Sequence, residues 1–190
     1  AFNAFEGTYK FYPPGSVTAA MPKLGIPANA DHGIFVFLLP YMDQAPLYER
    51  DKFTLNWDDN ANASVISTQL AVMQCPSVPK RDRTTTSNGN VVAAGDYAPD
   101  RGVDAALIGL GLIDNVSNTD GVLIPNFLCK VSQVTDGTSN TLVIAEDAGR
   151  PGLYRIGKEV PGTTPSGSGW ANPVCDYITH GFNSNGTSSP

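Results

Sequence analysis

Oxygen-bearing side chains gather in one stretch over residues 134–147, which reads VTDGTSNTLVIAED. The candidate metal ligands within it are Asp136, Asn140, Glu146 and Asp147. Carboxylate and amide oxygens are the ligands that calcium prefers. Their spacing is not that of an EF-hand loop, and a single carboxylate per turn binds a cation weakly. Calcium is therefore a candidate ligand of this stretch, and no cofactor is required by it.

The same stretch also has a purely structural interpretation. Asp136-Gly137 is a strong turn signal, because glycine supplies positive φ and aspartate bonds its own backbone. The residues over 142–145 are short, apolar and β-branched, which is typical of a buried strand. We favour this interpretation: a turn that leads into a core strand.

Nucleophilic catalysis finds little support in the sequence. Ser139 lies in no Gly-x-Ser-x-Gly elbow and has no base nearby in the chain. The two histidines, His32 and His180, are far apart, and we expect each to be a surface or capping residue. Because no nucleophile, base and orienting group can be placed together, the sequence predicts a protein that is not an enzyme.

Aromatic and acidic residues suggest a second class of site. Trp170 and Tyr177 could form a stacking platform for a carbohydrate, or they could cover the edge of a small core. Asp51, Asp58 and Asp59 lie near Trp57, a combination found in sugar sites. Asp58 and Asp59 could equally precede a helix N-terminus, where negative charge is favourable, and this is the interpretation we favour.

The chain has three cysteines, Cys75, Cys129 and Cys175, and none of them forms a Cys-x-x-Cys pair. A zinc site is therefore not indicated. In an oxidising compartment all three are disulfide candidates, and one pair would leave one thiol over.

The composition and charge of the chain restrict the classes of partner that it can bind. Only 16% of the 190 residues are charged and the net charge is −6, with no basic block. Nucleic acid and anionic membrane surfaces are disfavoured, because both need a basic patch. The low charge and the abundance of small polar residues suit a loop-rich protein outside the cytosol. The longest apolar run, residues 34–39, is too short to span a bilayer.

The predicted elements describe one α+β domain over residues 1–190. Residues 1–12 have the aromatic spacing of a helix end, and Pro13-Pro14-Gly15 stops it. The apolar segment 33–48 should break or kink at Pro40. Further predictions are a short helix from Asn60 or Asn62 to about residue 70, strands at 70–73, 91–97 and 142–145, a loop at 79–90, and a loop-rich region at 149–190. The predicted core consists of Phe35, Phe37, Leu38, Leu39, Tyr41, Leu47, Val72, Leu142, Val143 and Ile144.

Several motifs, read in order, resemble one family. They are FYPPG at 11–15, LLPYMDQ at 38–44 with Leu47-Tyr48, CPS at 75–77, Asp96-Tyr97, and TDGTSNT at 135–141 with Glu146. This order resembles the DUF1559 proteins, also called SBP_bac_10, which are abundant in planctomycetes and related bacteria.

The resemblance implies a type IV pilin-like or pseudopilin-like head. In that fold a remnant of the N-terminal helix, residues 1–12, packs on an antiparallel sheet with long loops, after prepilin-type processing. The implied protein is exported to the cell surface and self-associates or joins other pilin-like subunits in a filament. The alternative is a module that binds carbohydrate or a small solute. The family pattern also implies a C-terminal module beyond residue 190, so we expect the region 149–190 to be truncated. We expect no membrane contact by this fragment.

Overall fold

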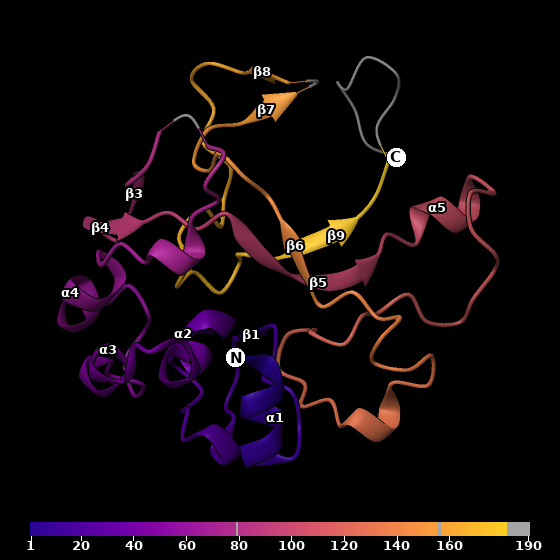
Figure 1. The fold of residues 1–190 in the computed structure, drawn as a ribbon, viewed down its shortest axis with the longest axis horizontal. Coiled ribbons are helices and arrows are strands. Elements are labelled where there is room, and N and C mark those ends of the chain that lie inside the picture. The colour runs from indigo at the N-terminus through magenta and orange to yellow at the C-terminus, as the bar shows by residue number, and fades with distance from the viewer. Residues whose placement is uncertain (79, 156, 182–190) are drawn as a thin grey trace.

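The computed structural model describes residues 1–78, 80–155 and 157–181, and helices dominate the first half of the chain (Figure 1). This half contains α1 (Phe2–Tyr9), η1 (Pro22–Leu24), α2 (Ile34–Leu38), η2 (Leu39–Met42), α3 (Ala45–Arg50), η3 (Asn60–Asn62), α4 (Ala63–Ile66) and η4 (Ala71–Met73), where η denotes a 3-10 helix. A small antiparallel pair, β1 (Ser16–Val17) and β2 (His32–Gly33), crosses it. The segment 70–73 was predicted as a strand, but it contains the 3-10 helix η4 instead.

Strands dominate the second half. They are β3 (Thr84–Ser87), β4 (Asn90–Ala93), β5 (Tyr97–Val103), β6 (Ile144–Glu146), β7 (Tyr154–Arg155), β8 (Lys158–Glu159) and β9 (Tyr177–Thr179), with α5 (Ala106–Gly109) and η5 (Val131–Gln133) between them. The predicted α+β class is confirmed. Of the predicted loop-rich region 149–190, residues 156 and 182–190 lie outside the described residues.

The central sheet has the order β6-β5-β9 and is mixed rather than antiparallel as predicted. β6 runs antiparallel to β5, with Tyr97 opposite Glu146, whereas β9 runs parallel to β5, with Asp100 opposite Tyr177. A parallel neighbour requires a long crossover connection. The chain between β5 and β9 provides that connection and carries the candidate site.

A hairpin replaces the loop predicted over residues 79–90. β3 pairs with β4, and the turn between them has φ of 48° at Asn88 and 77° at Gly89. Two consecutive positive φ values are the requirement of a type I′ turn, which Asn-Gly meets. The strand predicted at 91–97 is divided between β4 and β5, because the chain bends around Asp96. Pro79 lies outside the described residues.

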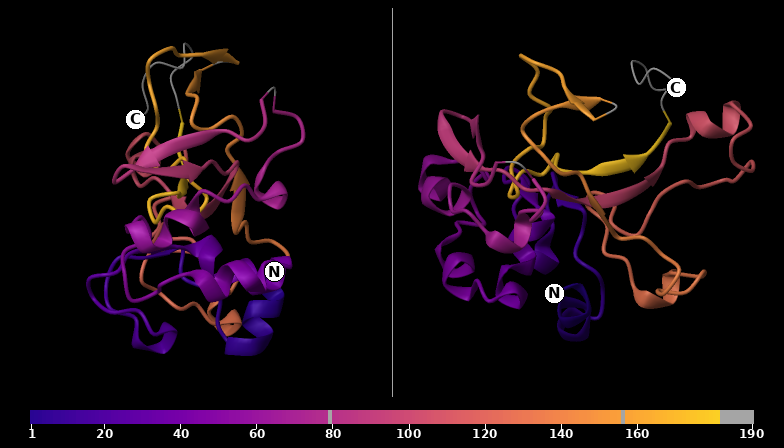
Figure 2. Two further views of the ribbon diagram at one scale, coloured as in Figure 1. Left: turned by 90° about the vertical axis from the view of Figure 1, so that its left-hand side faces the viewer. Right: turned by 45° about the horizontal axis from the view of Figure 1, so that its top comes forward.

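Helix α1 confirms the predicted helix but does not pack on the central sheet. Phe5 is buried and its ring lies 5.9 Å from that of Tyr41 in η2. Figures 1 and 2 both show α1 among the N-terminal helices, away from β5, β6 and β9. The helix ends at Tyr9, and its C-cap residue Lys10 adopts a left-handed φ of 64°. The predicted packing of a helix remnant on the sheet is therefore wrong.

The core is centred on α2. All of its residues are buried, and the chain passes from α2 into η2 at Leu39-Pro40, as the proline predicted. The predicted core residues confirmed as buried are Phe35, Phe37, Leu38, Leu39 and Leu47, while Tyr41, Val143 and Ile144 are partly buried against the core. Two predictions are wrong: Val72 is 55% exposed and Leu142 is 56% exposed.

The strand behind the Asp136-Gly137 turn begins two residues later than predicted, at Ile144. β6 is an edge strand of the three-stranded central sheet, so only β5 pairs with it. The apolar residues just before β6 are therefore not covered by a second strand. No helix among the described residues has the length and apolar character needed to cross a membrane.

Candidate binding groove

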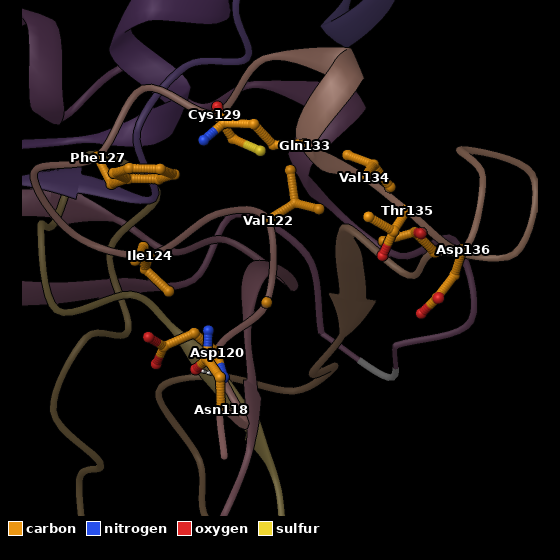
Figure 3. Close-up of a pocket in the computed structure, with 12 residues that line it drawn as sticks. Asn118, Asp120, Val122, Ile124, Phe127, Cys129, Gln133, Val134, Thr135 and Asp136 are labelled. Carbon is orange, nitrogen blue, oxygen red and sulfur yellow. Dashed lines mark hydrogen bonds between the residues drawn. The ribbon is translucent and has the colours of Figure 1, made fainter. Parts of the chain in front are cut away.

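A cavity of about 550 Å³ opens beside the central sheet (Figure 3). Its lining combines apolar and oxygen-bearing side chains from the part of the β5–β9 crossover that lies between β5 and β6. The lining residues are Asn118, Asp120, Gly121, Val122, Ile124, Phe127, Cys129, Gln133, Val134, Thr135, Asp136 and Thr141. We call this cavity the crossover groove.

One wall of the crossover groove, residues 118–129, is fixed by main-chain hydrogen bonds at both ends. At one end Gly121 N donates to the carbonyl of Arg101 in β5 at 2.7 Å. At the other end Tyr12 N donates to the carbonyl of Cys129 at 2.7 Å. Between them Leu123 is fully buried. The wall is therefore held by the sheet on one side and by the segment after α1 on the other.

Close backbone approach explains the glycine of the Pro13-Pro14-Gly15 motif. Gly15 N donates to the carbonyl of Ile124 at 3.2 Å, and a Cβ at Gly15 would lie 1.8 Å from the carbonyl oxygen of Leu123. Asn126 adds a side-chain clamp, because its Oδ1 accepts from Thr18 N at 2.8 Å. Any side chain at Gly15 would thus displace this wall.

The opposite wall contains η5 and the predicted turn. Gly137 has a φ of 82° and its N–H donates to the carbonyl of Val134 at 3.2 Å. The Asn140 side chain donates to the carbonyl of Asp136 at 3.0 Å, and Thr141 Oγ1 donates to the carbonyl of Gly137 at 3.1 Å. The turn of the favoured structural interpretation is present and is stabilised by its own polar side chains, but the strand behind it is not a buried core strand, since Leu142 is 56% exposed and no residue of β6 is fully buried.

The charged side chains of the groove lining are all negative. Asp120 and Asp136 are its ionisable carboxylates, they lie on different walls in Figure 3, and the lining has no lysine, arginine or histidine. Phe127 is 39% exposed and offers a ring face. Burial raises the pKa of the Cys129 thiol, which keeps it protonated and a poor nucleophile. These groups can accept hydrogen bonds from a neutral or cationic ligand.

The four predicted calcium ligands are distributed over different elements. Asp136 and Asn140 belong to the turn, and Glu146 lies in β6. The Asp147 carboxylate accepts hydrogen bonds from Nε and Nη2 of Arg150. Among the described residues, no group of three or more His, Cys, Asp or Glu side chains is arranged to hold a metal ion. The three carboxylates of the predicted calcium site therefore do not form one ligand set.

The predicted aromatic platform is also not formed. Trp170 is fully buried, and its Nε1 donates to the carbonyl of Thr68 at 3.0 Å. A sugar ring has no access to a buried indole. Tyr177 is partly buried in β9. Trp170 instead belongs to the core, where Gly95 packs against it so closely that a Cβ would lie 3.0 Å from the Trp170 Cβ.

A buried ionic cluster, which the sequence did not indicate, centres on Asp96. This side chain is fully buried, and its Oδ2 accepts from Cys75 N at 2.8 Å and from Arg83 Nη2 at 2.6 Å. Its Oδ1 accepts from Gly149 N at 2.8 Å. Nε and Nη1 of Arg83 are buried without a hydrogen-bond partner among the described residues. We call this group the Asp96 cluster.

The three cysteines, predicted as disulfide candidates, are all buried free thiols in the structure. Cys175 is the most enclosed, and burial raises its pKa to about 11 although Arg150 Nη1 lies 3.2 Å from its sulfur. Arg150 also donates to the carbonyl of Gly167 at 2.9 Å. The thiol and the guanidinium thus attach the chain after β6 to the segment that precedes β9.

A second buried pair joins His32 and Asp51, so His32 is not the surface or capping residue that we predicted. His32 Nε2 lies 3.2 Å from the carbonyl of Phe53, while its Nδ1 lies 4.0 Å from Asp51 Oδ1. Those two facing atoms have no hydrogen-bond partner among the described residues. Desolvation lowers the pKa of His32 to about 4 and raises the pKa of Asp51 to about 7. Burial favours the neutral form of both groups.

Asp58 and Asp59, the other acidic residues considered for a sugar site, have structural roles. Asp59 Oδ1 accepts from Ala61 N at 2.8 Å at the start of η3, as the helix N-terminus interpretation predicted. Asp58 accepts from the Asn56 side chain at 2.7 Å and from Ser87 Oγ at 2.7 Å. These carboxylates stabilise turns and connect the helical half to the β3–β4 hairpin.

Comparison with known proteins identifies the family. The family described as SBP_bac_10, "Protein of unknown function (DUF1559)", matches residues 1–187. The chain belongs to the DUF1559 family. No curated protein and no solved structure matches the chain. The match confirms the resemblance that the ordered motifs indicated.

Two of the DUF1559 motifs meet in the Asp96 cluster, although they are distant in sequence. The CPS motif supplies the Cys75 N–H, and the Asp-Tyr motif supplies the carboxylate that accepts it. Sequence reasoning missed Arg83 because its partner Asp96 lies 13 residues away, and it missed the burial of Arg150 because Gly167 and Cys175 are remote along the chain. The available signal was an aspartate at 96 within the apolar run of β4 and β5, since a buried carboxylate needs donors.

Proposed function

We propose that this DUF1559 protein is a non-enzymatic, exported protein that works by assembling with other subunits, as the head of a pilin-like or pseudopilin-like filament at the cell surface. One observation carries the proposal. Residues 105–113, in and after α5, contain no charged side chain, and Leu110 and Leu112 are 57% and 66% exposed. Contiguous exposed apolar surface is rare on soluble monomers and marks contact with another protein.

The chemistry of the crossover groove supports a role without catalysis. Its hydroxyls and its thiol have no histidine, lysine or arginine beside them in the lining. The buried His32 has its Nε2 at the Phe53 carbonyl and faces a carboxylate rather than a nucleophile. An arrangement for acyl or phosphoryl transfer would need a base within reach of a nucleophile.

The test uses the full-length gene product in its native host. A photo-crosslinking amino acid replaces Leu112, and a matched control places it at Val174, which is 52% exposed outside the α5 segment. We expect adducts of higher mass from position 112 and few from position 174, and we expect added protease to degrade the protein on intact cells. Equal crosslinking at both positions, or full protection from protease, would contradict the proposal.

A second function, binding of a carbohydrate or small polar solute, is favoured by the crossover groove itself. Its volume of about 550 Å³ is that of a small-molecule site. Asp120, Asp136 and the ring of Phe127 are groups that can hold hydroxyls and a sugar face. Calorimetry against oligosaccharides and small polyols tests it, with Asp136→Asn in the groove and Asp58→Asn outside it as the matched pair. Absence of heat across the panel would remove this function.

A further inference from the structure

The surface that carries the proposed assembly is a lobe built on β5. The α5 lobe consists of residues 104–120, and its base is closed where Val103 N donates to the carbonyl of Thr119 at 2.9 Å. Leu107 is buried and anchors the lobe, whereas Leu110 and Leu112 have more than half of their surface exposed. Figures 1 and 2 show α5 projecting at the edge of the molecule.

The charge around the α5 lobe restricts its partner. No lysine or arginine occurs between Arg101 and Lys130, while Asp104, Asp114 and Asp120 lie within the lobe. An anionic membrane surface would repel these carboxylates. Two lobes in contact would bring the carboxylates of both copies together. The partner must therefore present apolar surface next to a positive charge.

A groove of that chemistry exists elsewhere on the chain. It has a volume of about 390 Å³ and is lined by Ala20, Met21, Pro22, Lys23, Asn126, Phe127 and Leu128. Lys23 is the one charged side chain in this lining. We call it the Lys23 groove.

The Lys23 groove is held in shape by local hydrogen bonds. Met21 N donates to the carbonyl of Ile26 at 2.9 Å, and Ile26 N donates back to the carbonyl of Met21 at 3.2 Å. On the other side, the Asn126 side chain donates to Thr18 Oγ1 at 2.9 Å. Preformed walls reduce the ordering cost of binding.

We propose that the α5 lobe of one copy docks into the Lys23 groove of a second copy, with Leu110 and Leu112 in the apolar groove and Asp114 beside Lys23. The inference rests on the proposed assembly function and names its partner and its surfaces. Because the two surfaces differ, the contact is heterologous, and repetition produces open-ended chains or rings rather than a closed dimer.

The experiment measures the mass of the purified chain by sedimentation velocity from micromolar to millimolar concentration. We expect the wild type to form a concentration-dependent series of oligomers. Leu110→Ser/Leu112→Ser in the lobe and Lys23→Glu in the groove should each weaken association at least about tenfold. The matched controls, Val174→Ser and Lys130→Glu, change an exposed apolar residue and an exposed lysine outside both surfaces and should leave association unchanged.

Two further mixtures make the assignment specific. The lobe variant retains its groove and the Lys23→Glu variant retains its lobe, so a mixture of the two should form heterodimers that cannot grow. The double variant Lys23→Glu/Asp114→Lys should regain association by reversing both charges. Urea midpoints equal to that of the wild type show that each variant is folded.

Several outcomes would overturn the docking inference. They are a wild type that stays monomeric at millimolar concentration, a wild type that stops at a dimer, lobe and groove variants that behave like their controls, and binding of the lobe to anionic vesicles. These outcomes leave the proposed function separately testable. If the crosslinker at position 112 captures a different protein on cells while the purified chain is monomeric, the assembly role stands and the self-docking does not.

Discussion

Two of the buried carboxylates, Asp96 and Asp51, differ in the donors around them. Asp96 accepts from two backbone N–H groups and one guanidinium. Asp51 faces a histidine nitrogen at 4.0 Å, and its Oδ1 has no hydrogen-bond partner among the described residues. A carboxylate can stay charged in the interior when donors replace the lost water, and otherwise burial favours its neutral form. The Asp96 cluster therefore depends on charge, whereas the His32–Asp51 pair depends on protonation.

The largest expected effect is that of Asp96→Asn. Removing this charge leaves the buried Arg83 guanidinium without its counter-charge, which should reduce the free energy of unfolding by about 3–5 kcal/mol. Urea denaturation measures the loss. Asp136→Asn, a change at an exposed carboxylate, is the matched control and should stay within about 0.5 kcal/mol.

A double variant sharpens this prediction. Asp96→Asn/Arg83→Met removes the buried cation as well, so it should be more stable than the sum of the two single losses predicts. If the losses of the single variants simply add, the two side chains do not act as an ion pair, and the comparison with Asp51 loses its basis.

The next effect is the pH dependence of the His32–Asp51 pair. The pKa of Asp51, raised to about 7, adds stability that is complete below its unfolded value of 3.8 and is lost as the pH rises through 7. The pKa of His32, lowered to about 4, adds stability that is present above its unfolded value of 6.5 and is lost as the pH falls toward 4. In the wild type these two contributions oppose each other between about pH 4 and pH 7.

Single variants should separate the two contributions. Asp51→Asn leaves only the histidine, so the free energy of unfolding should fall from pH 7 to pH 4 relative to the wild type. His32→Gln leaves only the carboxyl, so the free energy of unfolding should rise over the same range. Urea midpoints at several pH values measure both slopes, and slopes of the same sign in the two variants would refute the assignment.

The smallest effect is expected for Asp147→Asn. The Asp147 side chain is 46% exposed, although it meets Arg150 through two donors. Exposed ion pairs contribute about 0–1 kcal/mol. The guanidinium keeps its bond to the carbonyl of Gly167 when this partner is removed. A loss of stability comparable with that of Asp96→Asn would mean that the number of donors, rather than burial, determines the loss in free energy of unfolding.

Local patterns along the chain predict only part of this structure. The apolar run of α2, the break at Pro40 and the Asp136-Gly137 turn were readable because their causes lie within a few residues. Val72 and Leu142 were assigned to the core wrongly, because an apolar side chain is buried only where another element covers it. The Asn88-Gly89 turn was readable in principle, since Asn-Gly between two short runs is a strong hairpin signal.

The candidate sites were less accessible to sequence reasoning. The turn at 136–141 was recognised, but the facing wall of the crossover groove was not, because it is held by bonds from Tyr12 and Gly15 to residues more than a hundred positions away. The Asp96 cluster likewise draws on Cys75, Arg83 and Gly149. A periodic pattern in the sequence reports the environment of single elements and does not report which distant elements meet.

The connection after α1 has a mechanical consequence. The helix ends at Tyr9, and shortly after it Tyr12 and Gly15 hydrogen-bond to the wall of the crossover groove. A pulling force applied to α1 would therefore load those bonds before it reached the central sheet. Because the same bonds hold one wall of the crossover groove, tension on the helix would act directly on the shape of the groove.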